Sequence, residues 1–92
     1  MSADLAALES SVAATYAELN RLLAASYRGV DRARLVTAVV DGHGLLVEVT
    51  FAKTVARHDP AVVAEAVRDA VADAQLTAGT AIAAAMEEVT GA

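Results

Sequence analysis

RLVTAVVDGHGLLVEVTFA, residues 34–52, contains two apolar runs joined by a four-residue turn. Side chains in both runs alternate along the chain, as in β-strands. The turn, Asp41-Gly42-His43-Gly44, has the Asp-Gly chemistry of hairpins and two glycines that accept positive φ. The stretch therefore predicts a β-hairpin, around which the rest of the chain is organised.

The two faces of this hairpin differ less in polarity than the two faces of a sheet that has one side in water. The alternation predicts an inner face formed by Val36, Ala38, Val40, Val47, Val49 and Phe51. The opposite face carries Leu35, Thr37, Val39 and Leu46, and is more apolar than a face that only meets water. We therefore predict that these four residues belong to a homodimer interface.

The flanking segments predict helices and one further strand. Residues 3–25 have apolar side chains at spacings of three and four, which indicates a helix whose stripe forms either core or a coiled-coil-like partner surface. Residues 27–32 suit a short edge strand. Asp59-Pro60 is a strong helix start, and helical spacing continues to the end of the chain, with a kink expected at Gly79.

The predicted fold class is therefore α+β, with a helix, a three-stranded antiparallel meander and a long C-terminal helix in a single domain spanning residues 1–92. The C-terminal helix is crowded with apolar residues from residue 81 to residue 86. Such a helix needs cover on several sides. Ile82 and Met86 are accordingly predicted to join the dimer interface.

Several classes of function have no support in the composition. The 92 residues include no Cys, which excludes disulfides and thiolate chemistry, and no apolar run approaches the roughly 18 residues of a membrane span. No targeting segment is recognisable at the N-terminus. We expect a soluble, cytoplasmic protein with no membrane partner, no cofactor and no small-molecule substrate.

The residues that carry catalytic or metal chemistry form no recognisable pattern. His43 and His58 are fifteen residues apart with no third ligand in a predictable position, whereas a metal site needs three or four. Gly42 and Gly44 lead into a strand rather than a helix N-terminus, so they predict no phosphate cradle. We therefore predict no metal site and no enzymatic activity.

The charge is unevenly distributed. The net charge is −5, yet residues 21–57 hold six basic residues against three acidic ones. These basic residues could contact DNA phosphates without reading bases, or they could form a solvated surface paired with Asp31, Glu48 and Asp59. The predicted DNA-binding residues are Arg21, Arg28, Arg32, Arg34, Lys53 and Arg57.

The chain resembles the YbaB/EbfC family of bacterial nucleoid-associated proteins. The resemblance rests on residues 35–42 (LVTAVVDG), Asp59-Pro60 and residues 67–74 (VRDAVADA), and it extends over about residues 25–90. It implies a protomer that dimerises through its sheet, with helical arms projecting like tweezers, and a DNA-binding role at the nucleoid. Thr37 stands where the family pattern has a strand lysine, and the first helix is acidic and rich in Ala and Leu.

Two functions follow from this comparison. The first is a nucleoid-associated homodimer that binds DNA with low specificity. The bias toward Ala, Val and Arg is typical of a high-GC, actinobacterial source, where YbaB-like domains are also similar to proteins associated with type VII secretion. The second function is therefore a dimeric protein-interaction module, adaptor or chaperone-like, that does not bind DNA.

Overall fold

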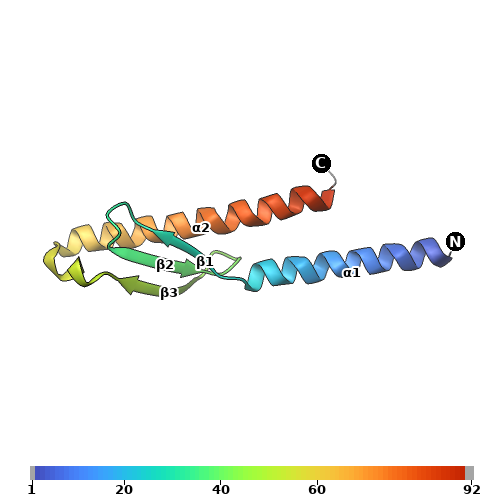
Figure 1. Cartoon of the computed structure of the whole chain (residues 1–92), viewed down its shortest axis with the longest axis horizontal. Coiled ribbons are helices and arrows are strands. Elements are labelled where there is room, and N and C mark those ends of the chain that lie inside the picture. The colour runs from blue at the N-terminus through green and yellow to red at the C-terminus, as the bar shows by residue number, and fades with distance from the viewer. Residues whose placement is uncertain (1, 91–92) are drawn as a thin grey trace.

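A computed structural model describes residues 2–90, with side chains from residue 5 to residue 88. The order of elements is α1 (Ser2–Ala24), β1 (Tyr27–Val30), β2 (Val36–Val40), β3 (Leu46–Phe51), a 3-10 helix η1 (Lys53–Arg57) and α2 (Pro60–Thr90). The three strands form one antiparallel sheet in the order β1-β2-β3 (Figure 1). The predicted α+β fold and its strand meander are confirmed.

The core lies between the sheet and α2. Along β2, Val36, Ala38 and Val40 are buried, as the alternation predicts. They meet a stripe of alanines that recurs every four residues on α2: Ala66, Ala70, Ala74 and Ala78. Such small side chains allow the helix to lie very close to the sheet. A methyl group at Gly29 of β1 would lie 2.7 Å from Ala74 Cα and closer still to Ala74 N and Ala70 O.

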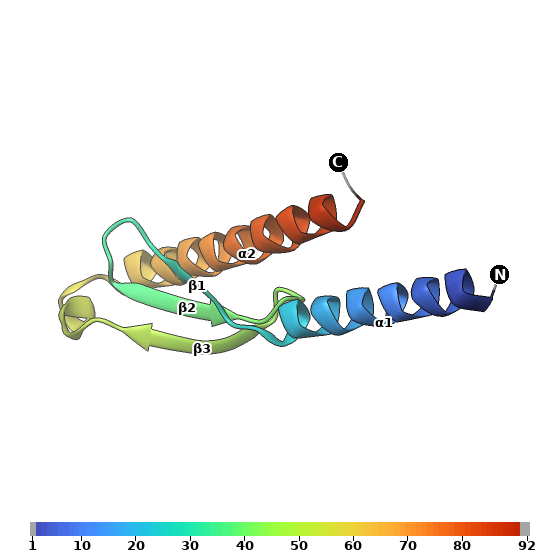
Figure 2. The same ribbon diagram turned by 45° about the vertical axis from the view of Figure 1, so that its right-hand side comes forward.

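The predicted inner face is only partly covered. α2 packs over β1 and β2, while β3 is the edge strand farthest from it (Figure 2). A helix about 10 Å wide spans two strands spaced about 4.8 Å apart, so the third stays open. Val49 packs against the core, but Val47 and Phe51 are 62% and 49% exposed. The predicted inner face is correct for Phe51, which pairs with the buried Val36, but neither Val47 nor Phe51 is covered within the protomer.

α2 begins where the sequence predicts. The Asp59 carboxylate accepts a hydrogen bond from the Ala61 N–H at 2.9 Å, and Pro60 is the first helical residue. The helix then runs without interruption through Gly79 to Thr90, so the predicted kink is absent from the described helix. A Cβ atom at Gly79 would meet nothing within 4 Å, so no neighbouring group requires glycine at this position.

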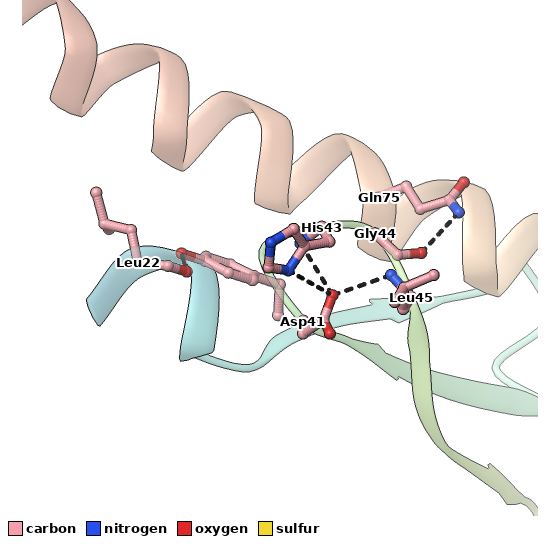
Figure 3. A network of polar contacts seen from close by, with 7 residues as sticks. Leu22, Asp41, His43, Gly44, Leu45 and Gln75 are labelled. Carbon is pink, nitrogen blue, oxygen red and sulfur yellow. Dashed lines mark hydrogen bonds and ion pairs between the residues drawn. The ribbon is translucent and has the colours of Figure 1, made fainter. Parts of the chain in front are cut away.

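α1 projects from one end of the sheet as an arm, and the molecule measures 68 × 22 × 15 Å. The β2–β3 turn and β1 both hold its base: the Gly42 N–H of the turn donates to the Leu23 carbonyl at 2.9 Å, and the Tyr27 hydroxyl of β1 donates to the Leu22 carbonyl at 2.8 Å. Figure 3 shows how the same turn reaches α2, where Gln75 Nε2 donates to the Gly44 carbonyl at 3.0 Å. The turn thereby joins both helices.

The apolar stripe of α1 is largely uncovered within the protomer. Leu19 and Leu22, near the base of the helix, are partly buried and face Ala85 and Met86 of α2. Farther out, Leu5, Leu8 and Tyr16 are exposed. Core packing therefore accounts only for the base of this stripe, and its outer part is available to a partner.

Candidate nucleic-acid interface

The turn between β1 and β2 is organised by a buried carboxylate. Asp31 is only 5% exposed, and its two oxygens accept hydrogen bonds from the Val36 N–H at 2.8 Å and the Ala33 N–H at 3.2 Å. The Arg34 N–H closes the turn on the Asp31 carbonyl at 3.0 Å. A buried carboxylate that accepts two backbone N–H groups makes this a defined turn rather than a loose loop.

Arg34 is held in an unusual backbone conformation. Its φ is +58°, in the left-handed region, where a residue with a side chain is less stable than Gly by about 1–2 kcal/mol. Its side chain lines a shallow hollow with Val30, Asp31 and Thr37 on the sheet face opposite α2. The turn thus directs an exposed guanidinium toward the open face of the sheet.

The open face of the sheet also carries Arg28. On β1, Gly29 is buried against α2 and Tyr27 packs on the core, so the exposed Arg28 between them points the other way. Across the sheet, Arg28 pairs with Val39, and Val39 pairs with Glu48. A parallel row joins Val30, Thr37 and Thr50. This face is therefore of mixed polarity, with arginines at its β1 side.

Further basic residues gather at the end of the sheet away from α1. The Ala52 N–H donates to the Leu35 carbonyl at 2.8 Å, which places Lys53 beside the β1–β2 turn. Lys53 and Arg57 belong to η1, and both are exposed. Arg32 lies on the α2 side of the turn and lines a hollow with Glu65 and Asp69. The acidic neighbours of Arg32 make it a weaker candidate for phosphate than Arg34.

Arg21 lies apart from the other five predicted residues. It is in the last turn of α1, at the opposite end of the sheet, and its guanidinium donates two hydrogen bonds to the Glu18 carboxylate. These hydrogen bonds lower the pKa of Glu18 and raise the pKa of Arg21. The six residues therefore form no continuous belt within a protomer: five lie along the sheet and its far end, and one is paired on the arm.

Comparison with known proteins identifies the family of the chain. The model of the YbaB/EbfC DNA-binding family matches residues 1–92. The chain belongs to this family. A search of curated proteins finds no match. The family places nucleoid-associated DNA binding first among the functions that the sequence predicts.

The residues predicted to form the dimer interface of this YbaB/EbfC-family chain lie in different environments. Leu35 is 5% exposed and belongs to the core of the protomer, so little of it remains for a partner. Thr37 and Val39 are half-buried on the open sheet face. Leu46, on the free strand β3, is 50% exposed. Ile82 is half-buried and Met86 exposed, both on α2.

The two histidines of this YbaB/EbfC-family chain lie in different connections between its elements. His43 lies in the β2–β3 turn, with Nδ1 at 3.9 Å from an Asp41 oxygen, and His58 precedes α2. The described residues contain no cluster of three or more possible metal ligands. Within residues 2–90, neither helix has the length and apolar character that a membrane crossing requires.

Sequence reasoning missed the structural role of Asp31, which it treated as a possible surface partner of the arginines. The available signal was its position: an Asp that opens a turn commonly bonds backbone N–H groups two or more residues ahead. It is this carboxylate that fixes the turn carrying Arg34.

Proposed function

We propose that the protein is a nucleoid-associated homodimer in the cytoplasm that binds duplex DNA through low-specificity phosphate contacts. The observation that carries the proposal is the pair Arg28 and Arg34, exposed on or beside the open face of the sheet. Lys53 and Arg57 extend this basic surface at the far end. Guanidinium groups bind phosphate oxygens in forked geometry, which suits backbone contact.

The charge distribution favours one surface of the protomer over the others. α2 carries a single basic residue, Arg68, which is paired with Glu65 at 3.1 Å, and the arm α1 carries only the paired Arg21. DNA approaching either helix would meet mostly carboxylates, whereas the sheet side offers several exposed basic side chains. With a net charge of −5, binding should be modest and should weaken steeply as salt rises.

The test is a salt series of fluorescence anisotropy titrations with labelled duplex DNA. We expect the affinity of Arg28→Ala and Arg34→Gly to fall, with the slope of log affinity against log salt reduced by about 1 for each phosphate that the variant no longer neutralises. Two sequences of equal length should bind alike, since phosphate contacts carry no sequence information.

Arg34→Gly separates folding from binding. Because Arg34 has positive φ, Gly relieves a backbone conformation that disfavours a side chain, and the variant should melt no lower than the wild type. Arg68→Ala is the matched control, as it removes an exposed arginine from α2. If Arg68→Ala weakens binding as much as Arg28→Ala does, or if the wild type fails to bind DNA at low salt, the proposal is refuted.

A second candidate function is a dimeric protein-interaction module that does not bind DNA. It is favoured by the uncovered stripe of α1, where Leu5, Leu8 and Tyr16 are exposed. An apolar helical stripe of this kind suits a partner helix. The Leu5→Ser/Leu8→Ser double variant should then lose a specific protein partner while its DNA titration stays the same as that of the wild type.

A further inference from the structure

A trough runs between α2 and β3 on the side of the sheet that faces α2. One wall of the trough is a row of valines on α2, Val63, Val67 and Val71, and each of them is half-buried. Residues at intervals of four lie on one face of a helix. The next member of the row, Gln75, donates to the Gly44 carbonyl of the β2–β3 turn at 3.0 Å, so the row faces the β3 side of the sheet.

The floor of the trough is the uncovered part of β3. Phe51 and Val49 pair with Val36 and Ala38 of β2, both of which are buried against α2. Side chains of directly paired residues lie on the same face of a sheet, so Phe51 and Val49 face the trough. The ladder is regular from these pairs as far as Val39, where its register shifts.

At its end near η1, the trough opens into an apolar hollow of about 540 Å³. The side chains that line this hollow come from β3, η1 and the start of α2: Phe51, Val55, His58, Pro60, Val63 and Ala64. Phe51 is 49% exposed there. A hollow of this kind suits the apolar anchor side chains that an amphipathic helix lays into a groove.

The charges around the trough are unevenly placed. On the flank toward β1, α2 carries Glu65, Asp69 and Asp73 at intervals of four, and Asp73 Oδ2 accepts a backbone hydrogen bond from β1 at 3.0 Å. The valine row on the opposite flank carries no charge. Beside the hollow, η1 supplies Lys53 and Arg57, which are exposed and form no ion pair among the described residues.

We propose that this trough docks an acidic amphipathic helix of another protein. The valine row and Phe51 supply the apolar contact. Lys53 and Arg57 attract carboxylates to the end of the trough, and this charge complementarity selects an acidic partner. Asp59, the acidic residue of the same connection, already accepts the Ala61 N–H in capping α2.

The length and polarity of the trough define the helix that fits it. From Val63 to Gln75 the row is about 18 Å long, at roughly 1.5 Å per residue, which corresponds to about three helical turns. The C-terminus of a helix is its negative end. The partner therefore lies antiparallel to α2, with its last turn at η1. α1 of a second copy fits poorly, because its last turn carries Arg21 and continues into β1.

Docking at this site would also regulate DNA binding. Lys53 and Arg57 belong to the basic surface of the proposed function, and a helix bound at the hollow would cover both of them. The partner and DNA would then compete. This consequence rests on the proposed function, whereas the docking site itself does not.

The test measures binding of labelled synthetic peptides to the full chain by fluorescence anisotropy, without DNA. The acidic peptide has about 16 residues, enough to form a helix, with Leu along one face and Glu in its last two turns. The control peptide has Lys in place of Glu. We expect the acidic peptide to bind with a dissociation constant on the order of 10–100 μM that rises with salt, and the control peptide to bind about tenfold more weakly.

Charge substitutions at an exposed position of the hollow test the site without disturbing the core. Ala64→Glu should weaken binding of the acidic peptide by about twofold to fivefold, and Ala64→Lys should strengthen it by a similar factor. Ala61→Glu is the matched control, because it makes the same change in the same turn of α2 on the flank toward Arg32.

The apolar contact is tested separately. Phe51→Ser should weaken binding of the acidic peptide by about tenfold or more, whereas Leu76→Ser, which removes an exposed apolar side chain elsewhere on α2, should leave it unchanged. If Phe51→Ser fails to fold, the Ala64 variants still decide the question.

Three outcomes would overturn the docking site: no binding of the acidic peptide, equal binding of both peptides, or equal effects of Ala64→Glu and Ala61→Glu. A peptide of residues 2–20 of this chain that binds more tightly than the acidic peptide would assign the trough to a second copy and also overturn the proposal. A protein that binds the acidic peptide but not DNA would retain the docking site and refute the proposed function.

Discussion

Replacing Gly29 by Ala tests how closely β1 lies on α2. The added methyl group would lie 2.7 Å from Ala74 Cα, with Ala74 N and Ala70 O nearer still. All three atoms belong to a helix backbone, so no side-chain rotation can relieve the contact. The helix would have to retreat by more than about 1 Å to restore ordinary van der Waals separations of about 3.5 Å or more.

That retreat would loosen the whole alanine stripe from the sheet. Overpacking a core costs about 1–3 kcal/mol, and a clash between two backbones belongs at the upper end of this range. For a domain of this size, about 3 kcal/mol lowers the Tm by about 12–24 °C. Thermal unfolding followed by circular dichroism measures the change.

Gly79→Ala is the matched control, because the new methyl group would meet nothing within 4 Å on the same helix. Since Ala is a better helix former than Gly by about 1 kcal/mol, this variant should melt several degrees above the wild type. If Gly29→Ala melts within 3 °C or so of the wild type, the close approach of helix and strand described above is incorrect.

Two further predictions concern the turns. Asp31→Ala removes the acceptor of the Val36 and Ala33 N–H groups. The free energy of unfolding, measured in urea, should therefore fall by about 1–3 kcal/mol. The Asp31→Asn variant keeps one carbonyl oxygen as an acceptor and should be destabilised less. Gly42→Ala would place a methyl group 2.6 Å from the Leu22 carbonyl oxygen at the base of the arm. The protein should therefore be destabilised by about 1–3 kcal/mol. A variant as stable as the wild type would contradict the close contact between this turn and α1.

The elements that sequence reasoning predicted correctly are those fixed by local chemistry. Alternation sets β2, whose Val36 and Val40 are fully buried, and the Asp59 cap sets the start of α2. Neither depends on distant parts of the chain. The predicted order of helix, meander and helix follows from such local signals together with short connections.

The errors concern properties that only the assembled protomer determines. Which strands a helix covers depends on where it lies across the sheet, so alternation could not reveal that Val47 and Phe51 stay exposed. Similarly, the positive φ of Arg34 has no signal at its own position, where Gly or Asn would be expected. For the basic residues, sequence proximity grouped Arg21 with the others although the arm carries it to the opposite end of the sheet.

The projecting arm changes how the protein behaves in solution. A compact chain of this length has a radius of gyration of about 12 Å, whereas that of the protomer is 18.6 Å, the value of a compact protein of about 270 residues. On a gel-filtration column calibrated with globular standards, a single protomer would therefore migrate as though it were an oligomer. Elution volume would be a misleading guide to its assembly, and mass must be measured by sedimentation or light scattering.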